Sequence, residues 1–194
     1  IILSNGAHII KDKQTKITCI DEKTVKDVID YCDRNDLTYR YVLENGTGYL
    51  NRHDEDKENL FYRLYKMIPE IKTYENEKII HILLYSDVRQ QHEIAEIITE
   101  GDICYLGLAC EVSPKGYTKG SAMLKVMKEY GLEQKDLCAF GDGGNDIEML
   151  KSAALGIAMG NGRQELKDVA DYVAHDISDD GLYKALKHFG FLKG

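Results

Sequence analysis

The last third of the chain alternates short apolar runs with amphipathic segments, and this alternation limits the possible folds more than any other feature. The apolar runs have the length of strands, and the segments between them have helical spacing. The predicted strands are 136–140, 155–159 and 171–175, and the predicted helices are 121–132, 145–153, 163–170 and 179–190. Strands that alternate with helices across short links pair in parallel through right-handed βαβ units. The sequence therefore predicts an α/β fold with a parallel sheet.

The middle of the chain has a different pattern, which predicts a separate α+β lobe over residues 10–112. Helices are expected at 22–35, 56–68 and 89–99, and extended segments at 37–51, 78–86 and 103–113. The segment 37–51 contains Asn45-Gly46, a pair typical of hairpin turns, so two strands are expected there. We expect this lobe to interrupt the parallel-sheet domain, which then consists of residues 1–9 and 113–194.

Composition and charge disfavour several classes of protein. The chain has 194 residues, of which 43% are hydrophobic, and contains no run of about 18 apolar residues that would predict a membrane span. Its net charge is −8 without a sustained basic stripe, which disfavours a nucleic-acid partner. Five cysteines form no C-x-x-C pair, which favours reduced thiols and a cytoplasmic location over a zinc site. The sequence does not indicate an oligomeric state.

The hexapeptide GDGGND at 141–146 follows a predicted buried strand and precedes a predicted helix. Open parallel sheets bind ligands at the carboxyl ends of their strands, where glycines allow tight turns and close approach. Carboxylate oxygens suit Mg²⁺, and N–H groups at the start of a helix can help to hold an anion. Asp142 or Asn145 could instead only cap the helix, but the whole hexapeptide in this context favours a metal site.

Lys119 is the second polar feature of this region, near the start of the helix expected to run to about Tyr130. A lysine at a helix N-terminus is unfavourably placed in the helix dipole, so a nearby anion is the expected compensation. A solvated surface lysine is the alternative, and the position of Lys119 alone does not separate the two.

Three segments together resemble the haloacid dehalogenase superfamily. The segment GDGGNDIEMLKSAALGIAMGNGRQELKDVADYVAHDISDDGLYKAL, at 141–186, is similar to the C-terminal part of that superfamily nearly position for position. PKGYTKGSAML at 114–124 and IILSNGAHII at 1–10 resemble its Cof-like sugar phosphatases of subclass IIB. The resemblance implies a Rossmannoid parallel-sheet core, with the α+β lobe as an inserted cap. Gly162 is a departure, since relatives usually have alanine there.

The resemblance also implies an activity, the Mg²⁺-dependent hydrolysis of small phosphorylated metabolites, such as sugar phosphates, through an aspartyl-phosphate. Asp142 would be a magnesium ligand, and Asp146 would support either the metal or the lysine. Lys119 and Asn145 would bind phosphate, and Lys119 would also neutralise the charge of the nucleophile. Asn5, in the SNGA turn, would lie near the junction of core and cap and contact the substrate. Such roles suit the chemistry, because an anionic carboxylate approaches an anionic phosphate only where cations screen both charges.

The nucleophile of that family is the first aspartate of a D-x-D-G-T motif, and the sequence does not contain this motif. The segment DED at 54–56 lacks the following Gly-Thr and is interpreted as a solvated helix start, and DDG at 179–181 as a turn and helix cap. We therefore expect the chain to be a fragment of a phosphatase without turnover of its own. The alternative is a non-enzymatic phosphate-binding or interaction module derived from such a phosphatase.

Overall fold

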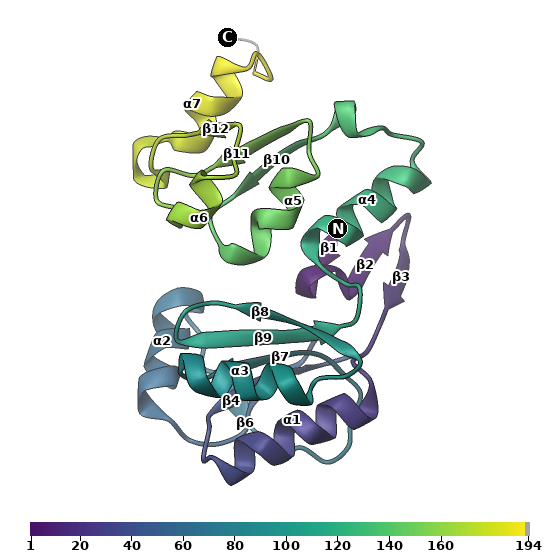
Figure 1. Cartoon of the computed structure of the whole chain (residues 1–194), viewed down its shortest axis with the longest axis vertical. Helices are drawn as coiled ribbons and strands as arrows, with labels where there is room; N and C mark the ends of the chain where they lie inside the picture. The colour runs from purple at the N-terminus through teal and green to yellow at the C-terminus, as the bar shows by residue number, and fades with distance from the viewer. Residues whose placement is uncertain (193–194) are drawn as a thin grey trace. The chain divides into compact units, whose positions relative to one another are not determined.

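The computed structural model describes residues 1–192, which fall into two compact units divided after Tyr117 (Figure 1). Strands pair only within a unit, so each unit is described by itself. Among the described residues, no helix is long and apolar enough to cross a membrane. The division lies close to the predicted change of pattern at residue 113, and the grouping of 1–9 with 113–194 in one domain stays a prediction.

A six-stranded sheet with the order β6-β5-β4-β7-β9-β8 is the main element of the first unit. Its strands are β4 (Tyr39–Leu43), β5 (Gly48–Leu50), β6 (Glu70–Ile71), β7 (Ile79–Tyr85), β8 (Gly101–Tyr105) and β9 (Ala109–Pro114). The predicted hairpin at 37–51 is confirmed, since β4 and β5 pair antiparallel around Gly46, whose φ of 85° suits a tight turn. The prediction of a single extended stretch at 103–113 was wrong, because two strands lie there. The chain turns there at Gly107, also with a φ of 85°, and forms the antiparallel pair β8 and β9.

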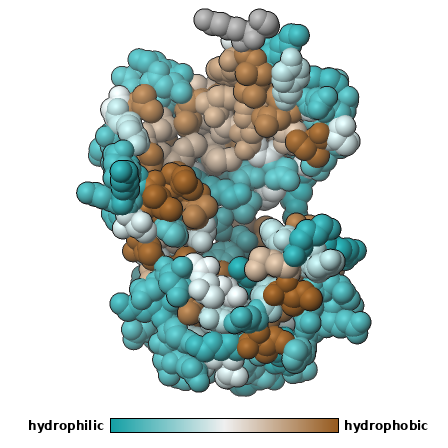
Figure 2. Space-filling view, turned by 180° about the vertical axis from the view of Figure 1, so that it is seen from behind, coloured by the Kyte–Doolittle hydropathy of each residue, from teal (hydrophilic) through white to brown (hydrophobic). Residues whose placement is uncertain are grey.

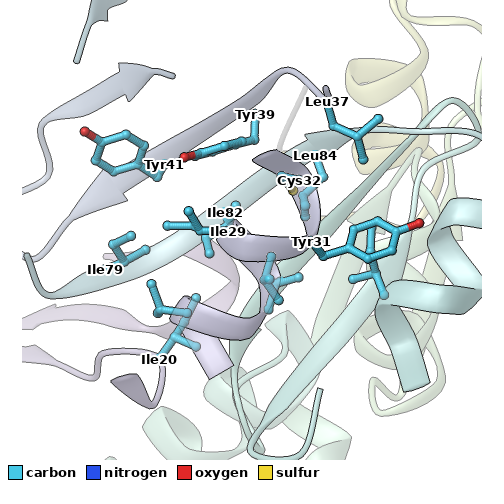
Figure 3. Packing of buried hydrophobic residues seen from close by; sticks show 14 of the residues in the cluster. Ile20, Ile29, Tyr31, Cys32, Leu37, Tyr39, Tyr41, Ile79, Ile82 and Leu84 are labelled. Carbon is cyan, nitrogen blue, oxygen red and sulfur yellow. The ribbon is translucent and has the colours of Figure 1, made fainter. Parts of the chain in front are cut away.

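The core of the first unit lies between one face of this sheet and two of the three helices. The helices are α1 (Glu22–Arg34), α2 (Glu55–Tyr65) and α3 (Val88–Ile97). Apolar side chains of α1 and α3 pack against alternate residues of the central strands. Figure 3 shows Ile29 and Cys32 of α1 among the strand residues Tyr39, Ile82 and Leu84. All five of these side chains are buried, so the helices α1 and α3 and the sheet form one hydrophobic core.

The helix α2 is shorter than predicted and contacts the opposite face of the sheet. Its Phe61 ring lies 5.6 Å from the guanidinium carbon of Arg40, a residue that alternates along β4 with the core residues Tyr39 and Tyr41. Asp54 caps the start of the helix, and its carboxylate accepts the N–H of Lys57. The helix ends at Tyr65, because the next residue, Lys66, has a left-handed conformation. The predicted continuation to residue 68 was therefore wrong.

Residues near the N-terminus form a second, three-stranded antiparallel sheet in the same unit. Its strands are β1 (Ile2–Leu3), β2 (His8–Lys11) and β3 (Gln14–Ile17), and the 3-10 turn η1 (Ser4–Gly6) joins β1 to β2. Ser4 and Asn5 both have positive φ in this turn, a conformation that asparagine tolerates better than most residues.

The second unit contains the predicted parallel sheet, with the order β10-β11-β12. The strands are β10 (Cys138–Gly141), β11 (Leu155–Ala158) and β12 (Tyr172–Val173). The helices are α4 (Lys119–Glu129), α5 (Ile147–Lys151), α6 (Gln164–Lys167) and α7 (Gly181–His188), with 3-10 turns η2 (Gln134–Asp136), η3 (Gly144–Asp146) and η4 (Ile177–Asp179). Every strand and helix predicted for the last third of the chain is present, so the predicted α/β class is confirmed.

Apolar side chains cover both faces of this parallel sheet. Leu150 of α5 and Leu166 of α6 pack with Ala139 on one face, and Ala185 of α7 packs with Ile157 on the other. In the described part of the chain, β10 has a neighbouring strand on one side only. Figure 2 shows apolar residues gathered over a broad face of the unit that carries the C-terminus.

The cysteines are free thiols, as the sequence predicts. Cys32 and Cys110 are buried in the first unit, and the other three are half-buried. Burial raises the pKa of the Cys110 thiol to about 11, with a smaller opposing effect from the Ser86 hydroxyl. The thiolate is the reactive form, so Cys110 is a packing residue rather than a nucleophile.

Candidate functional site

The acidic hexapeptide lies directly beyond the strand β10, at its carboxyl end, and leads through η3 into α5. Gly141 allows this chain path because a Cβ there would lie 2.5 Å from the Cβ of Asp146. The backbone N–H groups of Asp142 and Gly143 both donate to Oδ2 of Asp146, each at 3.0 Å. Asp146 therefore folds the loop back on itself, and its carboxylate is buried.

Lys119 is the first residue of α4, and its ammonium group lies in the same cluster. Its Nζ donates to Oδ1 of Asp146 at 2.6 Å and to Oδ1 of Asn145 at 3.2 Å. The Lys119 side chain is 34% exposed and the Asp146 side chain 5%, so the pair is screened from water on the aspartate side. Asp146 is thus the anion that offsets the unfavourable position of Lys119 in the helix dipole.

The close approach of α4 to α5 brings Lys119 within reach of this loop. A Cβ on Gly120 would lie 2.8 Å from Cγ and 3.0 Å from the carbonyl carbon of Glu148, so a larger residue would push the two helices apart. Sequence reasoning missed this role of Gly120. A glycine inside a helical pattern, one position after a charged residue, is the signal that could have indicated it.

Asp142 differs from Asp146 in its surroundings. Its side chain is exposed and makes no hydrogen bond or ion pair with any residue from 1 to 192. Its carbonyl accepts the N–H of Arg163 at 3.0 Å, which holds the backbone in place. A Cβ on Gly162 would lie 3.2 Å from Cα of Asp142, so Gly162 packs closely against the acidic loop. Gly162 is the position at which relatives usually have alanine.

The donor set accommodates a magnesium ion only in part. Mg²⁺ takes one or two carboxylates together with water and phosphate oxygens. Asp142 offers one carboxylate, whereas both oxygens of Asp146 already accept hydrogen bonds. Within residues 1–192, no group of three His, Cys, Asp or Glu side chains is arranged to hold a metal. Asp142 is the residue of this loop whose carboxylate accepts no hydrogen bond from residues 1–192, and metal binding by Asp142 and Asp146 stays a prediction.

Asn5 belongs to the other unit, where it forms a polar cluster of its own. Its Nδ2 donates to Oε2 of Glu111 at 2.8 Å. The other oxygen of Glu111 lies 3.3 Å from Nε2 of His81. The predicted contact of Asn5 with substrate stays a prediction.

The segment at 54–56 is the start of a helix, as predicted. Asp54 accepts the hydroxyl of Thr38 at 2.6 Å and caps α2. Burial raises the pKa of the Asp54 carboxyl, but the hydrogen bonds from Thr38 and from the backbone of Lys57 outweigh this effect and hold it below its ordinary value. Asp180 occupies the capping position of α7, although its side chain accepts no capping hydrogen bond.

Comparison with known proteins decides the family. Residues 1–186 match the family described as haloacid dehalogenase-like hydrolases. The chain belongs to this family. Among curated relatives, YkrA of Bacillus subtilis (strain 168), which is described provisionally as a phosphatase, is 31% identical to this chain over 153 residues. The match covers 79% of this chain and 54% of YkrA, so the chain spans about half the length of that relative.

Two further proteins are similar to this chain. A phosphoglycolate phosphatase of Methanothermobacter thermautotrophicus is 28% identical over 159 residues, which are 76% of this chain and 71% of the relative. The solved structure of the subclass IIB sugar phosphatase BT4131 superposes with a TM-score of 0.89 at 28% identity, covering 97% of this chain and 74% of that one. The resemblance to the haloacid dehalogenase superfamily and to subclass IIB is confirmed, and so is the expected fold.

The capping box that starts α4 gives a first testable prediction. The Thr118 hydroxyl accepts the N–H of Ser121 at 3.0 Å, and the Ser121 hydroxyl accepts the N–H of Thr118 at 2.9 Å. Thr118→Ala removes one of these bonds and should lower the free energy of unfolding by about 1 kcal/mol, measured by urea denaturation. Thr118→Ser keeps the hydroxyl and serves as the control. Equal stability of the alanine and serine variants would contradict a capping role.

Proposed function

We propose that this chain carries the metal-binding and phosphate-binding residues of a Mg²⁺-dependent phosphatase of small phosphorylated metabolites. The observation that carries the proposal is the cluster at the end of β10, where the Nζ of Lys119 lies 2.6 Å from Asp146 and 3.2 Å from Asn145. The exposed carboxylate of Asp142 begins the same loop. Phosphoryl transfer requires a cation and a hydrogen-bond donor for the phosphate, and a carboxylate for the metal. Lys119, Asn145 and Asp142 supply these groups, and the Asp142 carboxylate makes no hydrogen bond or ion pair with residues 1–192.

Each residue has a separate role in this proposal. Lys119 neutralises phosphate, and Asp146 orients Lys119 rather than the metal, because its two oxygens accept the lysine and two backbone N–H groups. Asn145 accepts from Lys119 through Oδ1, so the Nδ2 of the same amide is the group that would donate to a phosphate oxygen. Asp142 would hold Mg²⁺. When bound, that ion withdraws charge from the phosphate and stabilises the transition state.

The attacking carboxylate of the proposed aspartyl-phosphate mechanism is not among the candidates in this chain. The sequence contains no D-x-D-G-T, and Asp54 is occupied as a helix cap. We propose that a segment outside residues 1–194 supplies the nucleophile. The greater length of YkrA and BT4131 supports this, since the chain covers 54% and 74% of them. The name of BT4131 supports sugar phosphates as the substrate class.

A comparison of two versions of the protein tests the proposal. Phosphate release from a panel of sugar phosphates with Mg²⁺ would be measured for the 194-residue chain and for a version extended upstream along its reading frame. We expect turnover only from the extended version, because losing a covalent nucleophile removes several orders of magnitude in rate.

Two results would contradict parts of the proposal. Turnover by the 194-residue chain, abolished by a substitution within it, would show that the nucleophile lies inside residues 1–194. No turnover by either version, together with saturable phosphate binding at Lys119, would favour the alternative of a non-enzymatic phosphate-binding module.

A further inference from the structure

A pocket of about 720 Å³ lies within the first unit, on the sheet face that α2 contacts. Its wall includes Arg40 of β4, Gly48 of β5, Phe61 of α2, and Met67 and Ile68, which follow α2. A volume of this size is typical of sites for small molecules. Neither the acidic loop nor Lys119 contributes to this pocket.

Arg40 is the unusual residue of the pocket, because it is a partly buried cation without an anion. Among residues 1–192, it forms no ion pair with a carboxylate, and its Nε is buried without a hydrogen-bond partner. Its guanidinium carbon lies 5.6 Å from the centre of the Phe61 ring, a cation–π distance. Burial lowers the pKa of the Arg40 guanidinium, with smaller opposing effects from Tyr65 and Tyr85, yet an arginine stays charged at neutral pH.

The strand register places Glu111 on the same sheet face as Arg40, two strands away. Arg40 of β4 pairs with Leu83 of β7, and Leu83 pairs with Glu111 of β9. Two strand spacings therefore separate Arg40 from Glu111, about 10 Å between the backbones. Glu111 is also engaged by Asn5 and His81. Glu70, the other carboxylate of the pocket, is exposed and forms no ion pair with Arg40.

The Arg40 guanidinium lies against Gly48, in space that a larger side chain at residue 48 would occupy. A Cβ on Gly48 would lie 2.7 Å from Cζ and 3.0 Å from Nε of Arg40, and would also collide with Nη2. Any larger residue would force the guanidinium aside. Because residue 48 has no side chain, the unpaired guanidinium of Arg40 can lie at the surface of the pocket.

The rim of the pocket offers apolar surface. Tyr65 is 64% exposed, Met67 59% and Ile68 50%, and all three line the pocket. Exposed apolar side chains around a cavity with one charged group are a common arrangement for a ligand that has a carbon skeleton and an anionic end.

We propose that this pocket binds a small organic anion through its carboxylate or phosphate group, with the Arg40 guanidinium as the recognition group. Arginine suits such oxyanions, since its N–H groups form a planar fork that matches two oxygens. The apolar rim then contacts the carbon skeleton of the ligand. The inference goes beyond the proposed phosphatase function and does not rest on it.

Titration by nuclear magnetic resonance tests this inference on the full 194-residue chain. The ¹⁵N-labelled protein is titrated separately with inorganic phosphate and with acetate, at constant ionic strength set by sodium chloride. The Arg40 side-chain N–H signal and the backbone amides of Thr47 and Gly48 are followed. We expect saturable shifts with at least one anion. Saturation by phosphate alone identifies a phosphate site, and saturation by acetate alone a carboxylate site.

Matched variants assign the binding to Arg40. Arg40→Gln should weaken the affinity at least about tenfold, the usual effect of losing a charge-assisted pair of hydrogen bonds. Gly48→Ala keeps the charge but displaces the guanidinium, and should also weaken binding. Arg52→Gln is the control, because Arg52 likewise has a buried, unpaired Nε but is ion-paired to Asp36. Lys119→Met should leave these shifts unchanged. Non-saturating shifts with both anions, or full affinity in Arg40→Gln, would overturn the inference.

Discussion

Replacing Lys119 by methionine is expected to lower the free energy of unfolding of the unit that begins at Thr118 by about 2–4 kcal/mol. Methionine keeps most of the length of the side chain but removes the ammonium, so the buried carboxylate of Asp146 loses its cation. Two backbone N–H groups remain bound to Asp146 and do not replace that charge. The expected loss is less than for a fully buried pair, because one third of the Lys119 side chain is exposed. Urea denaturation, with hydrogen exchange of the β10 and β11 amides, measures it.

A double-mutant cycle separates the ion pair from other effects of the substitution. Asp146→Asn alone places an amide N–H or a weaker acceptor against Lys119 and should also destabilise the unit. When combined with Lys119→Met, the asparagine is no longer opposed by a cation, so the double variant should be more stable than the sum of the single losses predicts. Additive losses would show that Lys119 and Asp146 act independently, contrary to their distance of 2.6 Å.

The second unit could be predicted from its sequence because local signals agree there. Apolar strands of four or five residues alternate with helices, and the parallel pairs Phe140–Ile157 and Ile157–Tyr172 follow from that order. The first unit was less predictable at its turns. Gly107 lies within an otherwise apolar run, so the residue pattern alone predicts one strand there. In the structure, the positive φ of Gly107 turns the chain and produces two strands, β8 and β9.

The candidate site was predictable in its residues but not in their pairing. The hexapeptide and Lys119 lie 26 residues apart at the closest bonded pair, Lys119 and Asn145, and only the folded unit shows that Asp146 holds the lysine. The pocket at Arg40 was not predicted at all. Alternation along β4 places Arg40 on the sheet face opposite the buried tyrosines, but the residues that lie near it on that face depend on the register of β7 and β9. Register across several strands is not readable from one strand's sequence.

Asp142→Asn is expected to reduce phosphate-ester hydrolysis about 100-fold or more in the upstream-extended protein, while leaving the stability of the chain nearly unchanged. Asparagine keeps the size and one oxygen but removes the charge that would hold Mg²⁺, and loss of one preorganised charge interaction typically costs this much in rate. Stability should change by no more than about 0.5 kcal/mol, because the Asp142 side chain is exposed and only its backbone N–H and carbonyl make hydrogen bonds.

The Asp142 and Lys119 variants should differ in whether stability changes together with activity. Lys119 and Asp146 stabilise each other, so their variants change stability and activity together, whereas Asp142 should change activity alone. Asp180→Asn is the matched control, since it removes the same charge from an exposed aspartate of the same unit whose side chain caps nothing. The measurements are initial rates over a range of Mg²⁺ concentrations, with urea unfolding of each 194-residue variant. If Asp142→Asn retained the full rate at low Mg²⁺, the assignment of the metal to Asp142 would be wrong.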